Sequence, residues 1–203
     1  ALFAGVTIGT LSKYLHHSLA LLHHVLHQLP LSQVKRPSDA VLQRIGEQMG
    51  DLYGNAMHGC IGVTDGSIHA LEKDRAANEN FFYDEDHPDY NGWKSLYCKK
   101  GLYIFCFDGM IIWYAINCPG SWHDSLVADR AYPFLMDLPQ ECWILGDTAF
   151  SRIEGKLERV RKKGEHLPDE DERAHFQLNL ERFCSTMRIS SEWGIKDVKC
   201  VWL

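Results

Sequence analysis

The sequence predicts an α/β domain, built around a mixed sheet flanked by helices and preceded by a helical segment. Two features support this: apolar residues recur at helical spacing over the first fifty positions, and short strand-like runs dominate from residue 60 onward. With 203 residues, 45% of them hydrophobic and 24% charged, the chain is long enough to bury a substantial core. We therefore expect a globular α/β protein.

Two amphipathic helices are predicted at the start of the chain. Apolar residues between Leu11 and Leu29 follow an i, i+3, i+4 pattern, and Pro30 is expected to end that helix. A second helix should begin after Ser38, a favourable N-cap, and run to Met49 before Gly50 ends it.

The first of these helices is rich in histidine. His23 and His27 are an i, i+4 pair, which is a spacing that can bind a metal ion. An exposed polar face is the simpler interpretation, and we expect it here.

The rest of the chain reads as strand, hairpin, helix, strand and helix. The Phe107-Asp108-Gly109 turn is expected to join the two strands of the hairpin. The expected ranges are, in order, Cys60 to His69, Leu96 to Phe107, Met110 to Cys118, Ser125 to Met136, Cys142 to Leu145, and Ala174 to Lys199. A strand that follows a crossover helix is expected to lie parallel to an earlier neighbour.

Composition excludes several classes of protein. The formal net charge of −6 argues against binding nucleic acid through bulk positive charge. Seven cysteines without a CxxC pair indicate reduced thiols rather than disulfides or a zinc site. No run of 18 apolar residues is present, so we expect an intracellular protein without a membrane span. Because the chain lacks a starting Met and stops in an apolar run, we also expect a fragment.

Four carboxylates stand at positions suited to a shared site: Asp65, Asp124, Asp147 and Glu192. Asp65 lies within the first strand and Asp147 at the end of the strand after the crossover helix, so parallel pairing would bring them together. Asp124 begins the crossover helix, and Glu192 can approach from the final helix. Each also has a structural interpretation: the Asp-Gly and Gly-Asp pairs as turns, Asp124 as an N-cap, and Glu192 as a solvated helix residue.

Six motifs in unbroken order, between Cys60 and Lys199, resemble the PIF/Harbinger transposases and the Harbinger-derived nucleases. The motifs are Gly62-x-x-Asp65-Gly66-Ser67-x-His69, Tyr90-Asn91-Gly92-Trp93-Lys94-Ser95, Asp108-Gly109, Pro119-Gly120-Ser121-x-His123-Asp124-Ser125, Gly146-Asp147-x-Ala149-Phe150, and Ser191-Glu192-Trp193-Gly194-x-Lys196. The resemblance implies an RNase H-like DDE nuclease domain that cleaves DNA. It assigns catalysis and metal binding to Asp65, Asp124, Asp147 and Glu192.

The resemblance also implies a domain organisation. Residues 1–57 would be a helical segment left from a helix-turn-helix region. Residues 5–14 resemble the last helix of such a region. Residues 58–203 would be the nuclease domain, truncated at its C-terminus. The family further implies a Myb/SANT-like partner protein and a location in the nucleus, while the cytoplasm and the oligomeric state stay open.

Such a site would use two divalent cations, Mg²⁺ or Mn²⁺. Two ions about 3.5–4 Å apart activate the attacking oxygen and stabilise the leaving oxygen of a phosphodiester. Carboxylates are the hard oxygen ligands that Mg²⁺ prefers. The acidic total charge is consistent with carboxylates that bound cations neutralise.

Basic residues on the same helix as Glu192 are expected to face DNA phosphates, because they recur at about i, i+4. The expected DNA contacts are Lys94, Arg188, Lys196 and Lys199. His69 and His123 flank two of the aspartates and are expected to hydrogen-bond a ligand carboxylate, to contact phosphate, or to be structural histidines.

The sequence has two alternative interpretations. A haloacid dehalogenase-like phosphohydrolase needs an Asp-x-Asp motif, but Gly66 and Ser67 follow Asp65. A domesticated or decayed transposase domain, which binds DNA or a partner protein without cutting, is the stronger alternative.

Overall fold

The computed structural model describes residues 7–71, 87–159, 165–166, 168 and 171–183. The chain divides into two compact units, residues 1–35 and residues 36–203. Within the described ranges, no helix is long and apolar enough to cross a membrane.

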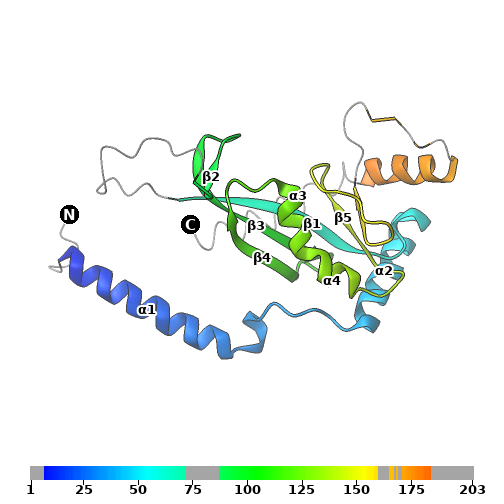
Figure 1. Cartoon of the computed structure of the whole chain (residues 1–203). Coiled ribbons are helices and arrows are strands. Elements are labelled where there is room, and N and C mark those ends of the chain that lie inside the picture. Colours follow the sequence, from blue (N-terminus) through cyan, green and yellow to red (C-terminus); the bar gives the residue numbers. More distant parts are fainter. Residues whose placement is uncertain (1–6, 72–86, 160–164, 167, 169–170, 184–203) are drawn as a thin grey trace. The chain divides into compact units, whose positions relative to one another are not determined.

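The first unit is built around one long helix, α1 (Ile8–Gln28), drawn in blue in Figure 1. Thr7 caps it, since the Thr7 hydroxyl accepts a hydrogen bond from the Thr10 amide at 3.2 Å. Pro30 opens a short 3₁₀ turn, η1 (Pro30–Ser32), so the predicted helix and its end are confirmed. All five α1 histidines are exposed, as expected.

The second unit contains a six-stranded mixed sheet. Its strands are β1 (Cys60–Ala70), β2 (Tyr90–Asn91), β3 (Leu96–Cys106), β4 (Ile111–Pro119), β5 (Trp143–Gly146) and β6 (Leu157–Arg159). The order is β2-β3-β1-β5-β6, and β4 also pairs with β3. The predicted β3–β4 hairpin is confirmed, and so is the parallel pairing of β1 with β5. The short strands β2 and β6 were not predicted, because two or three residues show no periodicity.

Two helical predictions need correction. Gly50 does not end the second helix, because α2 (Asp39–Tyr53) continues to Gly54, where φ is +89°. A left-handed backbone favours glycine there, whereas a glycine inside a packed helix costs only about 1 kcal/mol. Ser38 does occupy the N-cap position, although its side chain makes no capping bond.

The predicted helix from Ser125 to Met136 is wrong as a single element. It consists of α3 (Asp124–Ala128), a 3₁₀ turn η3 (Asp129–Ala131) and α4 (Tyr132–Met136). Pro133 has no amide hydrogen to donate back to the preceding turn, so a continuous α-helical ladder cannot pass through it. A short 3₁₀ turn, η2 (Asn55–Met57), also joins α2 to β1.

Apolar clusters cover both faces of the sheet. On one face, Val127 and Leu135 of α3 and α4 belong to the same core cluster as Ile104 and Ile144. Figure 1 shows α3 and α4 running across the sheet beside β3 and β4. On the other face, a second cluster joins Leu145 of β5 to Leu180 of the helical residues 171–183.

Two elements extend this packing. α2 contributes to both clusters, with Leu42 in the first and Met49 in the second. The predicted final helix is present over 171–183, where Leu180 and Phe183 are buried as expected; its continuation lies outside the described residues. The mixed α/β class is confirmed.

Candidate functional site

Three of the four predicted carboxylates line one pocket of about 220 Å³. Asp65 contributes from β1, Asp147 from the residue after β5, and Asp124 from the start of α3, while Lys100 of β3 is the cation in the wall. The remaining wall residues are Gly66, Ser67, Ile68, Gly101, Leu102, Val127, Ala149 and Phe150. The pocket therefore combines three acidic side chains with one basic side chain.

Strand register makes Asp65 and Asp147 neighbours. Thr64 pairs with Gly146 in the parallel β1–β5 ladder, and each aspartate is the next residue along its chain. Adjacent strands lie about 4.8 Å apart, and alternating side chains two residues apart share a face. Val63 and Leu145, two residues earlier, pack against the same apolar cluster. The two aspartates therefore belong to the sheet face that also packs against residues 171–183.

Each of these aspartates also binds the amide that follows it. The Gly66 amide donates to Oδ1 of Asp65 at 2.7 Å, and the Thr148 amide donates to Oδ1 of Asp147 at 2.6 Å. These bonds orient the carboxylates. Each aspartate can therefore be both a turn residue, as the sequence suggests, and a metal ligand.

Asp124 approaches the pocket from the other layer. It is the first residue of α3, which packs through Val127 into the opposite core cluster. The N-cap of α3 is His123, whose Nδ1 accepts from the Ser125 amide at 3.3 Å and lies 3.0 Å from the Ser125 hydroxyl. The N-cap interpretation of Asp124 is therefore wrong, because the preceding residue already caps the helix.

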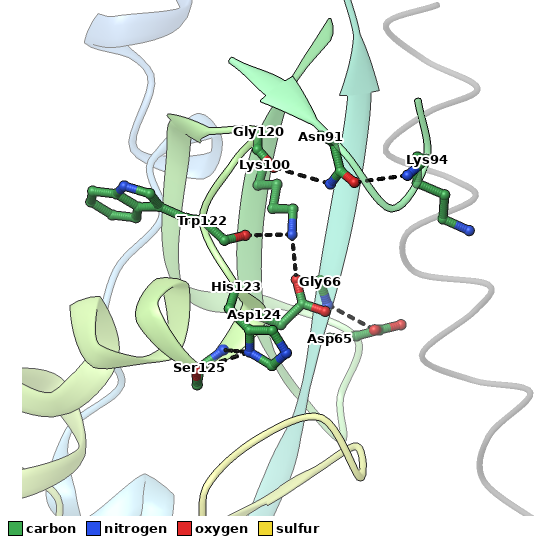
Figure 2. A network of polar contacts seen from close by, with 10 residues as sticks. All are labelled: Asp65, Gly66, Asn91, Lys94, Lys100, Gly120, Trp122, His123, Asp124 and Ser125. Atoms are coloured by element: carbon green, nitrogen blue, oxygen red, sulfur yellow. Dashed lines mark hydrogen bonds and ion pairs between the residues drawn. The ribbon is translucent and has the colours of Figure 1, made fainter. Parts of the chain in front are cut away.

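Lys100 is the closest described partner of Asp124. Its Nζ donates to Oδ1 of Asp124 at 2.9 Å and to the backbone carbonyl of Trp122 at 2.6 Å, and Figure 2 shows the ammonium between the two. The Lys100 side chain is only 9% exposed, whereas that of Asp124 is 50% exposed. A buried ammonium needs such partners to offset its lost hydration.

A buried asparagine connects two of the sequence motifs. Asn91 Nδ2 donates to the Gly120 carbonyl at 3.0 Å, and its Oδ1 accepts from the Lys94 amide at 2.9 Å (Figure 2). Asn91 is buried while Lys94 is exposed. The Asn91 contacts thus tie the turn that carries Lys94 to the loop leading into α3.

The two predicted histidines differ in surroundings. His69 Nε2 lies 2.7 Å from the hydroxyl of Ser67, a residue of the pocket wall. His123 caps α3, as described above. Glu192, Arg188, Lys196 and Lys199 lie outside the described residues, so their predicted roles stay predictions.

Lys100 and Asn91 were not among the residues predicted from the sequence to form the site. One feature of the sequence could have identified Lys100. It lies on the same face of β3 as Leu102 and Ile104, where an apolar residue is expected. Its partner Asp124 lies 24 residues further along the chain, and only packing identifies such a contact.

The donor set fits a divalent cation in part. Asp65 and Asp147 offer adjacent hard oxygen ligands of the kind that Mg²⁺ takes. Over the described part of the chain, no group of three or more His, Cys, Asp or Glu side chains has metal-binding geometry. The described residues therefore supply two adjacent carboxylates, and any third protein ligand would come from a rearranged Asp124 or from residues that the structure does not describe.

Comparison with known proteins supplies the family. The model of the DDE superfamily endonucleases matches residues 65–203, which is more than half of the 203-residue chain and includes all four predicted carboxylates. Searches of curated proteins and of solved structures gave no significant match. The extent of the family match decides the assignment: this chain belongs to the DDE superfamily endonucleases.

Proposed function

We propose that the chain is a metal-dependent DNA endonuclease of the transposase type, with Asp65, Asp147 and Glu192 as its metal ligands. The observation that carries the proposal is the parallel β1–β5 register, which makes two of these carboxylates neighbours in one pocket. Membership of the DDE superfamily endonucleases supports the same chemistry.

Divalent cations bound there would activate the attacking oxygen and stabilise the leaving oxygen of a phosphodiester. Asp65 and Asp147 would hold the cations, Mg²⁺ or Mn²⁺ and two in number, because carboxylate oxygens suit both ions. Their bonds to the amides of Gly66 and Thr148 keep the carboxylates oriented before metal arrives. Glu192 would complete the set from the C-terminal part of the chain, and Asp124 would line the pocket beside these ligands.

The finer family assignment is also a proposal. The six motifs support the PIF/Harbinger group, and the strand order supports an RNase H-like sheet, with β1, β3 and β4 antiparallel and β5 parallel to β1. We propose that DNA phosphates contact Lys94, Arg188, Lys196 and Lys199. His69 and His123 would support the site, a Myb/SANT-like protein would be the partner, and the nucleus would be the location.

Cleavage of plasmid DNA with Mg²⁺ or Mn²⁺ tests the proposal. Asp65→Asn, Asp147→Asn and Glu192→Gln should each lower the rate at least about 100-fold, since they remove a metal ligand but keep its shape. Asp129→Asn is the matched control, because Asp129 is an exposed aspartate that does not line the pocket. DNA binding without metal-dependent cutting by the wild-type chain would instead support the domesticated, non-cleaving function.

A further inference from the structure

Lys100 occupies a position that the sheet would otherwise give to an apolar side chain. It lies in β3 between Ile68 of β1 and Cys118 of β4, and it alternates in phase with Leu102 and Ile104, which are each 1% exposed. Placing an ammonium at such a position is costly unless partners surround it. Lys100 therefore depends on the partners that its ammonium finds there.

Both described acceptors of Lys100 lie at the entrance to α3. The Trp122 carbonyl and the Asp124 carboxylate each accept one hydrogen bond from Nζ. Lys100 and Asp124 therefore form an ion pair in the pocket wall, and their opposite charges offset each other. Asp65 and Asp147 supply the negative charge on the other side of the pocket.

We propose that Lys100 is a positioning residue that holds Asp124 outside the metal-ligand set and so lowers the affinity of the pocket for divalent cations. This inference rests on the proposed metal site of Asp65 and Asp147. Lys100 acts through Asp124: its ammonium pairs with the carboxylate and also binds the Trp122 carbonyl, which holds Asp124 at the start of α3. Helix α3 packs on the sheet face opposite the one that the two aspartates share.

Opposite effects follow from removing each partner. Without the ammonium, Asp124 is an uncompensated carboxylate that can turn toward a bound cation, so metal should bind more tightly. Without the carboxylate, the Lys100 ammonium repels a cation in the same pocket, so metal should bind more weakly. Removing both restores the original net charge, and the affinity should return to its wild-type value.

Titration of the metal-free chain with Mn²⁺ by calorimetry, without DNA, measures this directly. Lys100→Met should bind Mn²⁺ about 10-fold more tightly, Asp124→Asn about 10-fold more weakly, and the double variant within about 3-fold of wild type. Methionine is unbranched and apolar, which suits the neighbouring core. Lys100→Arg keeps the positive charge, so its Mn²⁺ affinity should rise far less than that of Lys100→Met.

Two results would overturn the role of Lys100. One is a Lys100→Met chain that binds Mn²⁺ no more tightly than wild type. The other is a double variant at least 10-fold weaker than wild type, because Asp124 would then be a ligand already in the wild-type chain.

Asp65→Asn and Asp147→Asn test the proposed function separately in the same titration. If both leave Mn²⁺ affinity unchanged, the metal site fails. Lys100 is then judged by urea unfolding without metal, where Asp124→Asn should be less stable than the double variant because it leaves a buried charge unpaired. Equal stability would overturn the pairing role itself.

Discussion

Burial controls the chemistry of single cysteine side chains in this protein. All five described cysteines, at positions 60, 98, 106, 118 and 142, are buried and none forms a disulfide. Burial raises the pKa of Cys106 to about 11, with a further increase from the nearby Asp108 carboxylate, and burial also raises the pKa of Cys98 and Cys142. For these five cysteines, the structure agrees with the prediction of reduced thiols.

The thiols should accordingly be slow to react in the folded protein. At pH 8 a thiol of pKa 11 is ionised in about one molecule in a thousand, against about one in ten for a pKa of 9, and the thiolate is the nucleophile. A chain with Cys184→Ser and Cys200→Ser retains only the five described cysteines. Its reaction with iodoacetamide should be slow until urea is added, and rapid labelling of one thiol in the native chain would contradict this prediction.

At the scale of elements, the Asn91 side chain joins β2 to the loop before α3. It is buried, donates to the Gly120 carbonyl and accepts from the Lys94 amide. The sequence motifs contain these residues, but their contact spans 29 positions and depends on how the sheet brings β2 toward the end of β4.

Asn91→Ala should lower the free energy of unfolding by about 1–3 kcal/mol, because the Gly120 carbonyl and the Lys94 amide both lose a buried partner. Urea denaturation measures the change. Ser121→Ala is the control, since Ser121 is exposed and its hydroxyl donates to the Pro88 carbonyl in the same region. We expect that control to change stability by less than about 0.5 kcal/mol; equal effects would show that the buried amide has no special role.

At the scale of the molecule, the compact unit of the sheet begins at Arg36 and includes α2. Arg36 donates to the Asp137 carbonyl at 2.8 Å, and Leu42 and Met49 of α2 are buried in the two core clusters. The sequence grouped α2 with residues 1–57, because its amphipathic pattern does not tell which partner covers its apolar face. The predicted boundary at residue 57, between a helix-turn-helix remnant and the nuclease domain, stays a prediction.

Truncation distinguishes the two boundaries. A chain of residues 36–203 should unfold cooperatively, with a melting temperature close to that of the full chain. A chain of residues 58–203 should fail to fold, because it loses Leu42 and Met49, and each large core side chain contributes about 2–5 kcal/mol. Circular dichroism during heating measures both, and a cooperative transition of the shorter chain at the same temperature would refute this expectation.

Local sequence patterns were enough to predict the longer strands, the first two helices and one long-range relation. Period-two and period-3.6 patterns identify β1, β3, β4, β5 and the first two helices because they reflect burial of one face. The handedness of the crossover predicts that β1 and β5 pair in parallel, and hence that Asp65 and Asp147 are neighbours.

The position of Asp124 relative to the other carboxylates depends on the packed structure. The sequence places it at the start of a helix, but it does not show that this helix lies on the layer opposite Asp65 and Asp147, or that a buried Lys100 neutralises it. The physical reason is the separation of the contacts along the chain. Local patterns show which side chains within a few residues are buried, whereas an ion pair between residues 24 positions apart depends on how whole elements pack.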